Sequence, residues 1–121
     1  MGVFVMIRSV EWEKASPELN DPVNNSFTSR PIYDGWNTNE ARDFIERYFD
    51  DYIKEGPYYE FDVCTMDHMI VDLQNSLGPD SDIPSDSIAA HEYKELLDAI
   101  MEYKAKHEDD WNSLYFIYSV S

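Results

Sequence analysis

The chain has 121 residues, 43% of them hydrophobic and 15% aromatic, and carries a formal net charge of -16 at pH 7. This apolar content is too high for a disordered chain, so we expect residues 1–121 to form one globular domain. Because 25 Asp and Glu outnumber 9 Lys and Arg, its surface should repel phosphate backbones and anionic lipid headgroups. We therefore expect no direct binding to nucleic acid or to a membrane. A basic protein partner, a cationic ligand or solubility alone would be consistent with the charge.

The first ten residues, MGVFVMIRSV, predict a strand and not a targeting segment. They have no basic region before the apolar run, no small-residue cleavage pattern and, with Met6, no N-myristoylation pattern. The sequence also has no apolar span of 18 residues, and its single cysteine, Cys64, can form no disulfide framework. These features predict a cytoplasmic protein.

Residues 3–12 are predicted to form a buried strand, because apolar side chains fall on both of its faces. Residues 13–35 contain Pro17, Pro22 and Pro31 and a run rich in Asn, Ser and Asp, which is typical of a loop. Loops of this length in compact domains are usually functional or mobile. The sequence thus predicts a long connection between the first strand and the first helix.

The first helix is predicted over residues 38–55, where a Gly-Pro pair follows. Asn37 and Glu40 have the spacing of a capping box, and Trp36 and Ala41 that of a hydrophobic staple. Apolar residues at helical spacing predict its core face, made of Ala41, Phe44, Ile45, Tyr48, Phe49 and Tyr52. The opposite face is predicted to lie in water, with Asp43, Glu46 and Asp50.

The rest of the chain predicts two further helices and two strands. A strand over 58–63 precedes a helix over 66–77, and a helix over 86–106, capped by Ser85, precedes a strand over 114–120. The inward residues predicted for the last helix are Ile88, Tyr93, Leu96, Leu97, Ile100 and Met101. The pattern indicates an α+β fold, in which a small sheet includes the N- and C-terminal strands and three amphipathic helices cover it.

Two groups of side chains have partial metal-ligand spacing. Cys64 and His68 are four residues apart on a predicted helix, but no third ligand shares a short motif with them, so Cys64 is predicted to be a small core residue. Asp80, Asp82 and Asp86 resemble the start of a calcium loop that lacks its glycine and its final bidentate Glu. We therefore assign no metal, no cofactor and no catalytic residue.

The segment DFIERYFDDYIKEGPYYEFD, residues 43–62, combines seven carboxylates with four tyrosines. Pairs such as Asp43 with Arg47 and Asp50 with Lys54 have the spacing that stabilises a helix, but they leave a large excess of negative charge. Folding does not require that excess, whereas a basic partner would be attracted by it. The predicted partner-binding residues are Asp43, Glu46, Asp50, Asp51, Glu55, Tyr58, Tyr59, Glu60 and Asp62.

In size, charge and predicted fold class the chain is similar to phage-encoded inhibitors of host defence enzymes, such as anti-CRISPR proteins, and to bacterial immunity proteins that neutralise nuclease toxins. No sequence motif carries this likeness. It implies a non-enzymatic protein that binds a basic nucleic-acid-binding enzyme or effector and occupies its groove as a nucleic-acid mimic. If the protein is phage-encoded, its location would be the host-cell cytoplasm.

Two other functions are compatible with the sequence. A small-molecule binding or sequestering protein would have a pocket between the helices and the 13–35 loop, lined by Trp12, Tyr33, Trp36 and Trp111. A metal-assisted hydrolase would need carboxylates that converge in a cleft. The position of the carboxylates and aromatics in the fold distinguishes the three functions.

Overall fold

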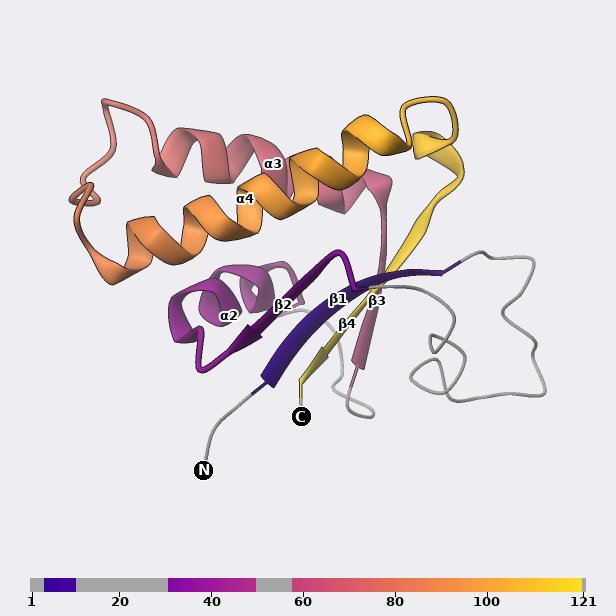
Figure 1. The fold of residues 1–121 in the computed structure, drawn as a ribbon, viewed down its shortest axis with the longest axis horizontal. Helices are drawn as coiled ribbons and strands as arrows, with labels where there is room; N and C mark the ends of the chain where they lie inside the picture. The colour runs from indigo at the N-terminus through magenta and orange to yellow at the C-terminus, as the bar shows by residue number, and fades with distance from the viewer. Residues whose placement is uncertain (1–3, 11–30, 50–57, 121) are drawn as a thin grey trace.

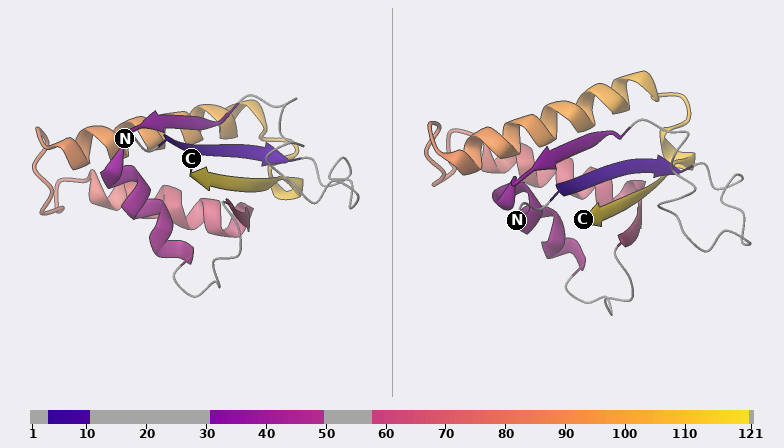
Figure 2. Two further views of the ribbon diagram at one scale, coloured as in Figure 1. Left: turned by 90° about the horizontal axis from the view of Figure 1, so that it is seen from below. Right: turned by 60° about the horizontal axis from the view of Figure 1, so that its bottom comes forward.

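The computed structural model of the chain describes residues 4–10, 31–49 and 58–120. They form a four-stranded antiparallel sheet in the order β2-β1-β4-β3, with α3 and α4 along one face and α2 packed beside α4 (Figures 1 and 2). The elements are β1 (Phe4–Val10), β2 (Tyr33–Trp36), α2 (Asn39–Glu46), the 3-10 turn η3 (Arg47–Phe49), β3 (Tyr58–Asp62), α3 (Val63–Ser76), α4 (Ile88–Lys106), η4 (Trp111–Ser113) and β4 (Tyr115–Val120). The predicted α+β fold, with both terminal strands in the sheet, is confirmed.

The two central strands, β1 and β4, place their alternate side chains in the core. Ile7 is opposite Tyr118 in the antiparallel register, and both are fully buried beneath the helices. Phe4 and Met6 point to the other face of the sheet and are only partly buried. The prediction that the first strand is buried on both faces is therefore wrong for its described residues.

The start of α2 differs from the predicted capping box. Asn37 has a positive φ of 58°, and Thr38 occupies the cap position without a side-chain hydrogen bond to the helix. Trp36 is 63% exposed, so it does not form the predicted hydrophobic staple with Ala41. The helix ends at Glu46 and continues as η3, while the predicted helical residues 50–55 lie outside the described ranges.

Helices α3 and α4 begin at other residues than predicted. Asp62 caps α3 by accepting from the backbone of Thr65 at 3.2 Å, so that helix begins at Val63. Ser87, and not Ser85, caps α4. In each case the cap is the residue whose oxygen can reach a free backbone N–H of the first turn.

The inward face of α4 is turned relative to the prediction. Ile88 is 74% exposed and Met101 is 39% exposed, although both were predicted to point inward. Leu96 and Ile100 are fully buried, and they fix the side of the helix that faces the core. Because adjacent residues are about 100° apart on a helix, Met101 next to buried Ile100 reaches the edge of that face.

Gly35 in β2 has no room for a side chain. A Cβ at this position would lie 2.5 Å from Thr38 Oγ1 and 2.9 Å from Tyr33 Oη. We expect Gly35→Ala to lower the free energy of unfolding by about 1 to 3 kcal/mol, since its neighbours are short or buried and must shift. At Gly78 the new Cβ would be 3.4 Å from two backbone oxygens, so Gly78→Ala should cost less than about 0.5 kcal/mol. Denaturant melts of both variants test this, and equal costs would contradict it.

Candidate functional site

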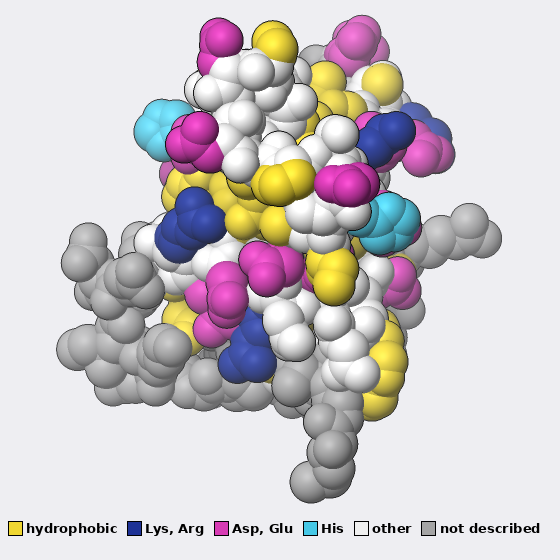
Figure 3. Space-filling model, turned by 90° about the vertical axis from the view of Figure 1, so that its left-hand side faces the viewer, with side chains coloured by type: hydrophobic (Ala, Val, Ile, Leu, Met, Phe, Trp, Pro, Cys, Tyr) yellow, Lys and Arg dark blue, Asp and Glu magenta, His cyan; other side chains and the backbone are white. Residues whose placement is uncertain are grey.

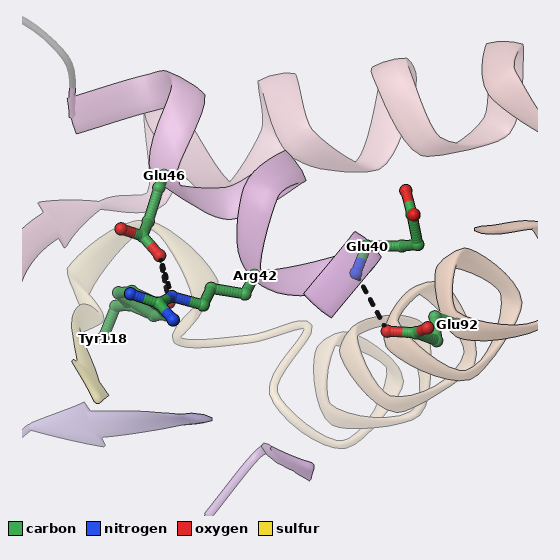
Figure 4. Close-up of polar contacts among 5 residues, drawn as sticks. All are labelled: Glu40, Arg42, Glu46, Glu92 and Tyr118. Atoms are coloured by element: carbon green, nitrogen blue, oxygen red, sulfur yellow. Dashed lines mark hydrogen bonds and ion pairs between the residues drawn. The ribbon is translucent and has the colours of Figure 1, made fainter. Parts of the chain in front are cut away.

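The acidic residues of α2 have different environments. Asp43 is exposed, and no basic side chain of the described ranges pairs with it. Glu46 was predicted to face water, but its side chain is only 20% exposed. It accepts from Arg42 Nε at 2.6 Å and from Tyr118 Oη at 3.2 Å, so it lies between α2 and β4 (Figure 4). The last turn of α2 packs over the sheet. Glu46, which was predicted to lie at the surface, therefore belongs to a polar network with Arg42 and Tyr118.

Arg47 contacts the core side of α2. It was predicted to pair with Asp43, but it donates to Tyr93 Oη at 3.2 Å, and its guanidinium carbon lies 5.3 Å from the centroid of the Phe44 ring. The ring face attracts the cation and holds its stem against the core. The predicted Asp43–Arg47 pair is therefore not observed. Arg47 instead contacts Tyr93 of α4 and Phe44 of α2.

The predicted residues of β3 alternate between the two faces of the sheet. Tyr59 points toward the helices and stacks on Phe49, with ring centroids 4.8 Å apart. Glu60 and Asp62 point to the other face and are exposed. Glu60 accepts from Tyr115 Oη at 2.8 Å. Tyr59 thus packs into the edge of the core, which makes it a poor candidate for an exposed binding anchor.

The described members of the predicted binding set do not form one surface. Asp43 lies on the outer side of α2, Glu60 lies on the sheet face away from the helices, and Asp62 caps the start of α3. The side chain of Tyr58, and all of Asp50, Asp51 and Glu55, lie outside the described part of the chain. A role in partner binding stays a prediction for all nine residues.

An acidic row runs along the outer face of α4. Glu95, Asp98 and Glu102 are exposed and follow one another at spacings of three and four residues, which places them on one side of the helix. His91 contacts Glu95 at 3.1 Å and Lys106 contacts Glu102 at 3.1 Å, both in exposed positions where pairing contributes little. No basic side chain within the described residues pairs with Asp98. This acidic row is therefore a rigid line of negative charge facing solvent.

A buried carboxylate joins α4 to the start of α2. Glu92 is 6% exposed, and its Oε1 accepts from the backbone N–H of Glu40 at 3.2 Å (Figure 4). It also accepts from the backbone N–H of Ala41 at 3.3 Å. It satisfies two of the N–H groups that Thr38 leaves free, at the positive end of the helix dipole. Glu92 was not among the residues predicted to have a functional role. Its spacing of four from Leu96 and eight from Ile100 places it on the buried side of the helix and could have indicated it.

Two adjoining hollows lie at the end of the molecule that carries the α3–α4 connection. One, of about 640 Å³, lies between the starts of α2 and α4 and includes Thr38, Ser87 and Glu92 in its lining. The other, of about 720 Å³, is lined on its apolar side by Leu77, Ile83 and Leu97. Figure 3 shows this end, where acidic (magenta), basic (dark blue) and histidine (cyan) side chains lie around exposed hydrophobic surface (yellow).

The residues with partial metal-ligand spacing do not form a metal site. Cys64 and His68 are both exposed on α3, so the prediction that Cys64 is a core residue is wrong. Its position in the first turn of α3 faces away from the buried side that begins at Met66. Within residues 4–10, 31–49 and 58–120 no three His, Cys, Asp or Glu side chains are grouped so that they could hold a metal ion.

The aromatic residues predicted for a small-molecule pocket are separated. Tyr33 is buried in the core, Trp36 extends from the other face of β2, and Trp111 is buried against Phe116 with ring centroids 5.6 Å apart. Trp12 lies outside the described ranges. The three described residues thus lie in different parts of the fold, and the small-molecule pocket stays a prediction.

Burial raises the pKa of several tyrosines in the described part of the protein. Burial raises the pKa of Tyr118, and the carboxylate of Glu46, which accepts its hydrogen bond, raises it further. Burial also raises the pKa of Tyr48, together with a hydrogen bond to Asp72. Both effects favour the neutral phenol in the folded protein.

We expect the protein to lose stability as the pH rises above about 10, the ordinary pKa of tyrosine. A raised pKa in the folded state stabilises the fold fully below the unfolded value, and that contribution falls once the unfolded chain begins to ionise. Denaturant melts between pH 8 and 11.5 measure the fall. Tyr118→Phe removes one of these phenols, so the stability of the variant should fall less steeply with pH; identical slopes would contradict the assignment.

None of the helices in the described ranges is both long enough and apolar enough to span a bilayer. The described residues form a small acidic α+β fold. Comparison with protein-family models, with curated proteins and with solved structures finds no match in any of the three.

Proposed function

We propose that the protein is a non-enzymatic inhibitor that binds the basic nucleic-acid groove of an enzyme or effector. The observation that carries the proposal is the acidic row of Glu95, Asp98 and Glu102 on a 19-residue helix. A helix fixes the spacing of these charges, because successive members lie about one turn apart, with about 5 to 6 Å between their Cβ atoms. Such a line of charge can occupy sites that otherwise hold phosphates.

The fold also supplies a rigid support for this surface. The buried side of α4 packs on the core through Leu96 and Ile100, so the outer carboxylates are held with little freedom of the backbone. A preorganised surface loses less conformational entropy on binding than a disordered acidic tail. Exposed Asp43 and Asp86 add to the negative potential of the helical side.

The experiment that tests this function begins with a pull-down from lysate of the source cell and measures binding of the recovered partner by calorimetry. We expect affinity to fall about tenfold or more between 50 and 200 mM salt, because several charge pairs form together. The partner's own DNA or RNA should compete with the protein for the same Lys and Arg side chains. Simultaneous binding of both, or affinity that does not change with salt, would overturn nucleic-acid mimicry.

A further inference from the structure

Glu92 is a buried carboxylate whose hydrogen-bond donors in the described part of the chain are uncharged. Its two hydrogen bonds come from backbone N–H groups at 3.2 and 3.3 Å, near the long end of the usual range. No Lys, Arg or His of the described residues forms an ion pair with it. Transfer of a carboxylate out of water is costly unless its charge is balanced, and the N-terminus of the eight-residue helix α2 balances it only in part.

The hollow beside Glu92 is wide, and most of the charged side chains in its lining are acidic. Its volume of about 640 Å³ exceeds that of an amino-acid side chain several times. Asp86 and Glu95 add negative charge to the lining, and Ser85 and Ser87 add hydroxyl acceptors. The basic groups in the lining are Lys94, which is exposed, and His91, which contacts Glu95 at 3.1 Å. The net charge of the lining is therefore negative.

We propose that this hollow receives an arginine side chain of the basic partner, with Glu92 as the buried counter-charge. The inference rests on the proposed function and adds to it the chemistry of one contact. Arginine fits better than lysine because its guanidinium is more weakly hydrated and presents several donors in one plane. The apolar hollow next to it, which shares Ser85, Ala90 and Lys94, makes a protein segment with an apolar residue near the arginine a better occupant than a free amine.

The test uses the full chain and N-acetyl-arginine amide as the probe, with N-acetyl-citrulline amide as its uncharged control. In an NMR titration the backbone amides of Glu40 and Ala41 should shift in a saturable way with the arginine probe, because both donate to Glu92. The citrulline probe should leave them unchanged. Saturable shifts confined to other parts of the chain, or equal shifts with both probes, would overturn the assignment.

Three variants test whether the charge of Glu92 binds the arginine probe. Glu92→Gln retains an oxygen for the two N–H groups but removes the charge, and should weaken probe binding about tenfold or more. Lys94→Ala removes the basic side chain of the lining and should strengthen it about twofold. Glu108→Gln, which changes an exposed carboxylate outside both the hollow and the acidic row, is the matched control and should have no effect. Unchanged affinity in Glu92→Gln, with its fold intact by circular dichroism, would overturn the proposal.

The two proposals fail in different ways. If the arginine probe binds through Glu92 but no recovered partner competes with nucleic acid, the inhibitor function is wrong and the cation site remains. If a partner binds in a salt-dependent manner but Glu92→Gln binds it as tightly as the unchanged protein, the cation site is wrong. In that second case the exposed carboxylates of α4 would carry the interaction.

Discussion

Replacing Phe44 by alanine should lower the free energy of unfolding by about 3 to 5 kcal/mol. The side chain is 1% exposed at the centre of α2, and its ring lies 5.6 Å from Tyr48 and 5.3 Å from Tyr93 by centroid distance. Truncation removes apolar surface that was withdrawn from water and leaves a cavity between α2 and α4. It also removes the ring on which Arg47 rests. Denaturant melts at neutral pH measure the loss.

Asp43→Asn is the matched control on the opposite face of α2. Its side chain is exposed, so the change should alter the free energy of unfolding by less than about 0.5 kcal/mol. Tyr48→Ala should give an intermediate loss, about 1 to 3 kcal/mol, because this ring is only half-buried and its hydroxyl reaches Asp72. Similar losses in Phe44→Ala and Asp43→Asn would mean that the buried face of α2 is misplaced.

Reversing two charges of the acidic row should abolish binding to the partner, with a loss of about a hundredfold or more in affinity. The double variant Asp98→Lys/Glu102→Lys places positive charge where the partner's basic groove would approach, so attraction becomes repulsion. Both side chains face water, and the fold should therefore persist. Calorimetry with the recovered partner measures the change, and circular dichroism verifies the helix content.

The control for this reversal keeps the same total charge. Glu108→Lys/Asp109→Lys changes two exposed acids beyond the end of α4, so it alters net charge by the same amount away from the row. We expect it to weaken binding about tenfold at most, through the general field of the protein. Equal losses in the two double variants would show that net charge alone, and not the acidic row, attracts the partner.

The candidate site lies on another segment than the predicted one, because partner binding was predicted for residues 43–62 and the acidic row belongs to α4. The sequence shows an excess of acids over residues 92–110, and the structure places Glu95, Asp98 and Glu102 of that segment in a row. Nothing in the sequence indicates that Glu46 accepts a hydrogen bond from Tyr118, which is 72 residues away in the chain. Contacts of this kind depend on how a helix is placed on a sheet, and local periodicity does not encode that placement.

The sequence by itself determined the class of fold, because the periods of its apolar residues differ between strands and helices and can be read locally. Only the tertiary structure decided the roles of individual carboxylates and the rotation of α4. Glu92 became buried because it lies on the side of α4 that packs against α2, where the free N–H groups of Glu40 and Ala41 offset the loss of water. Ile88 remained exposed because it lies at the start of α4, outside the side of the helix that Leu96 and Ile100 bury.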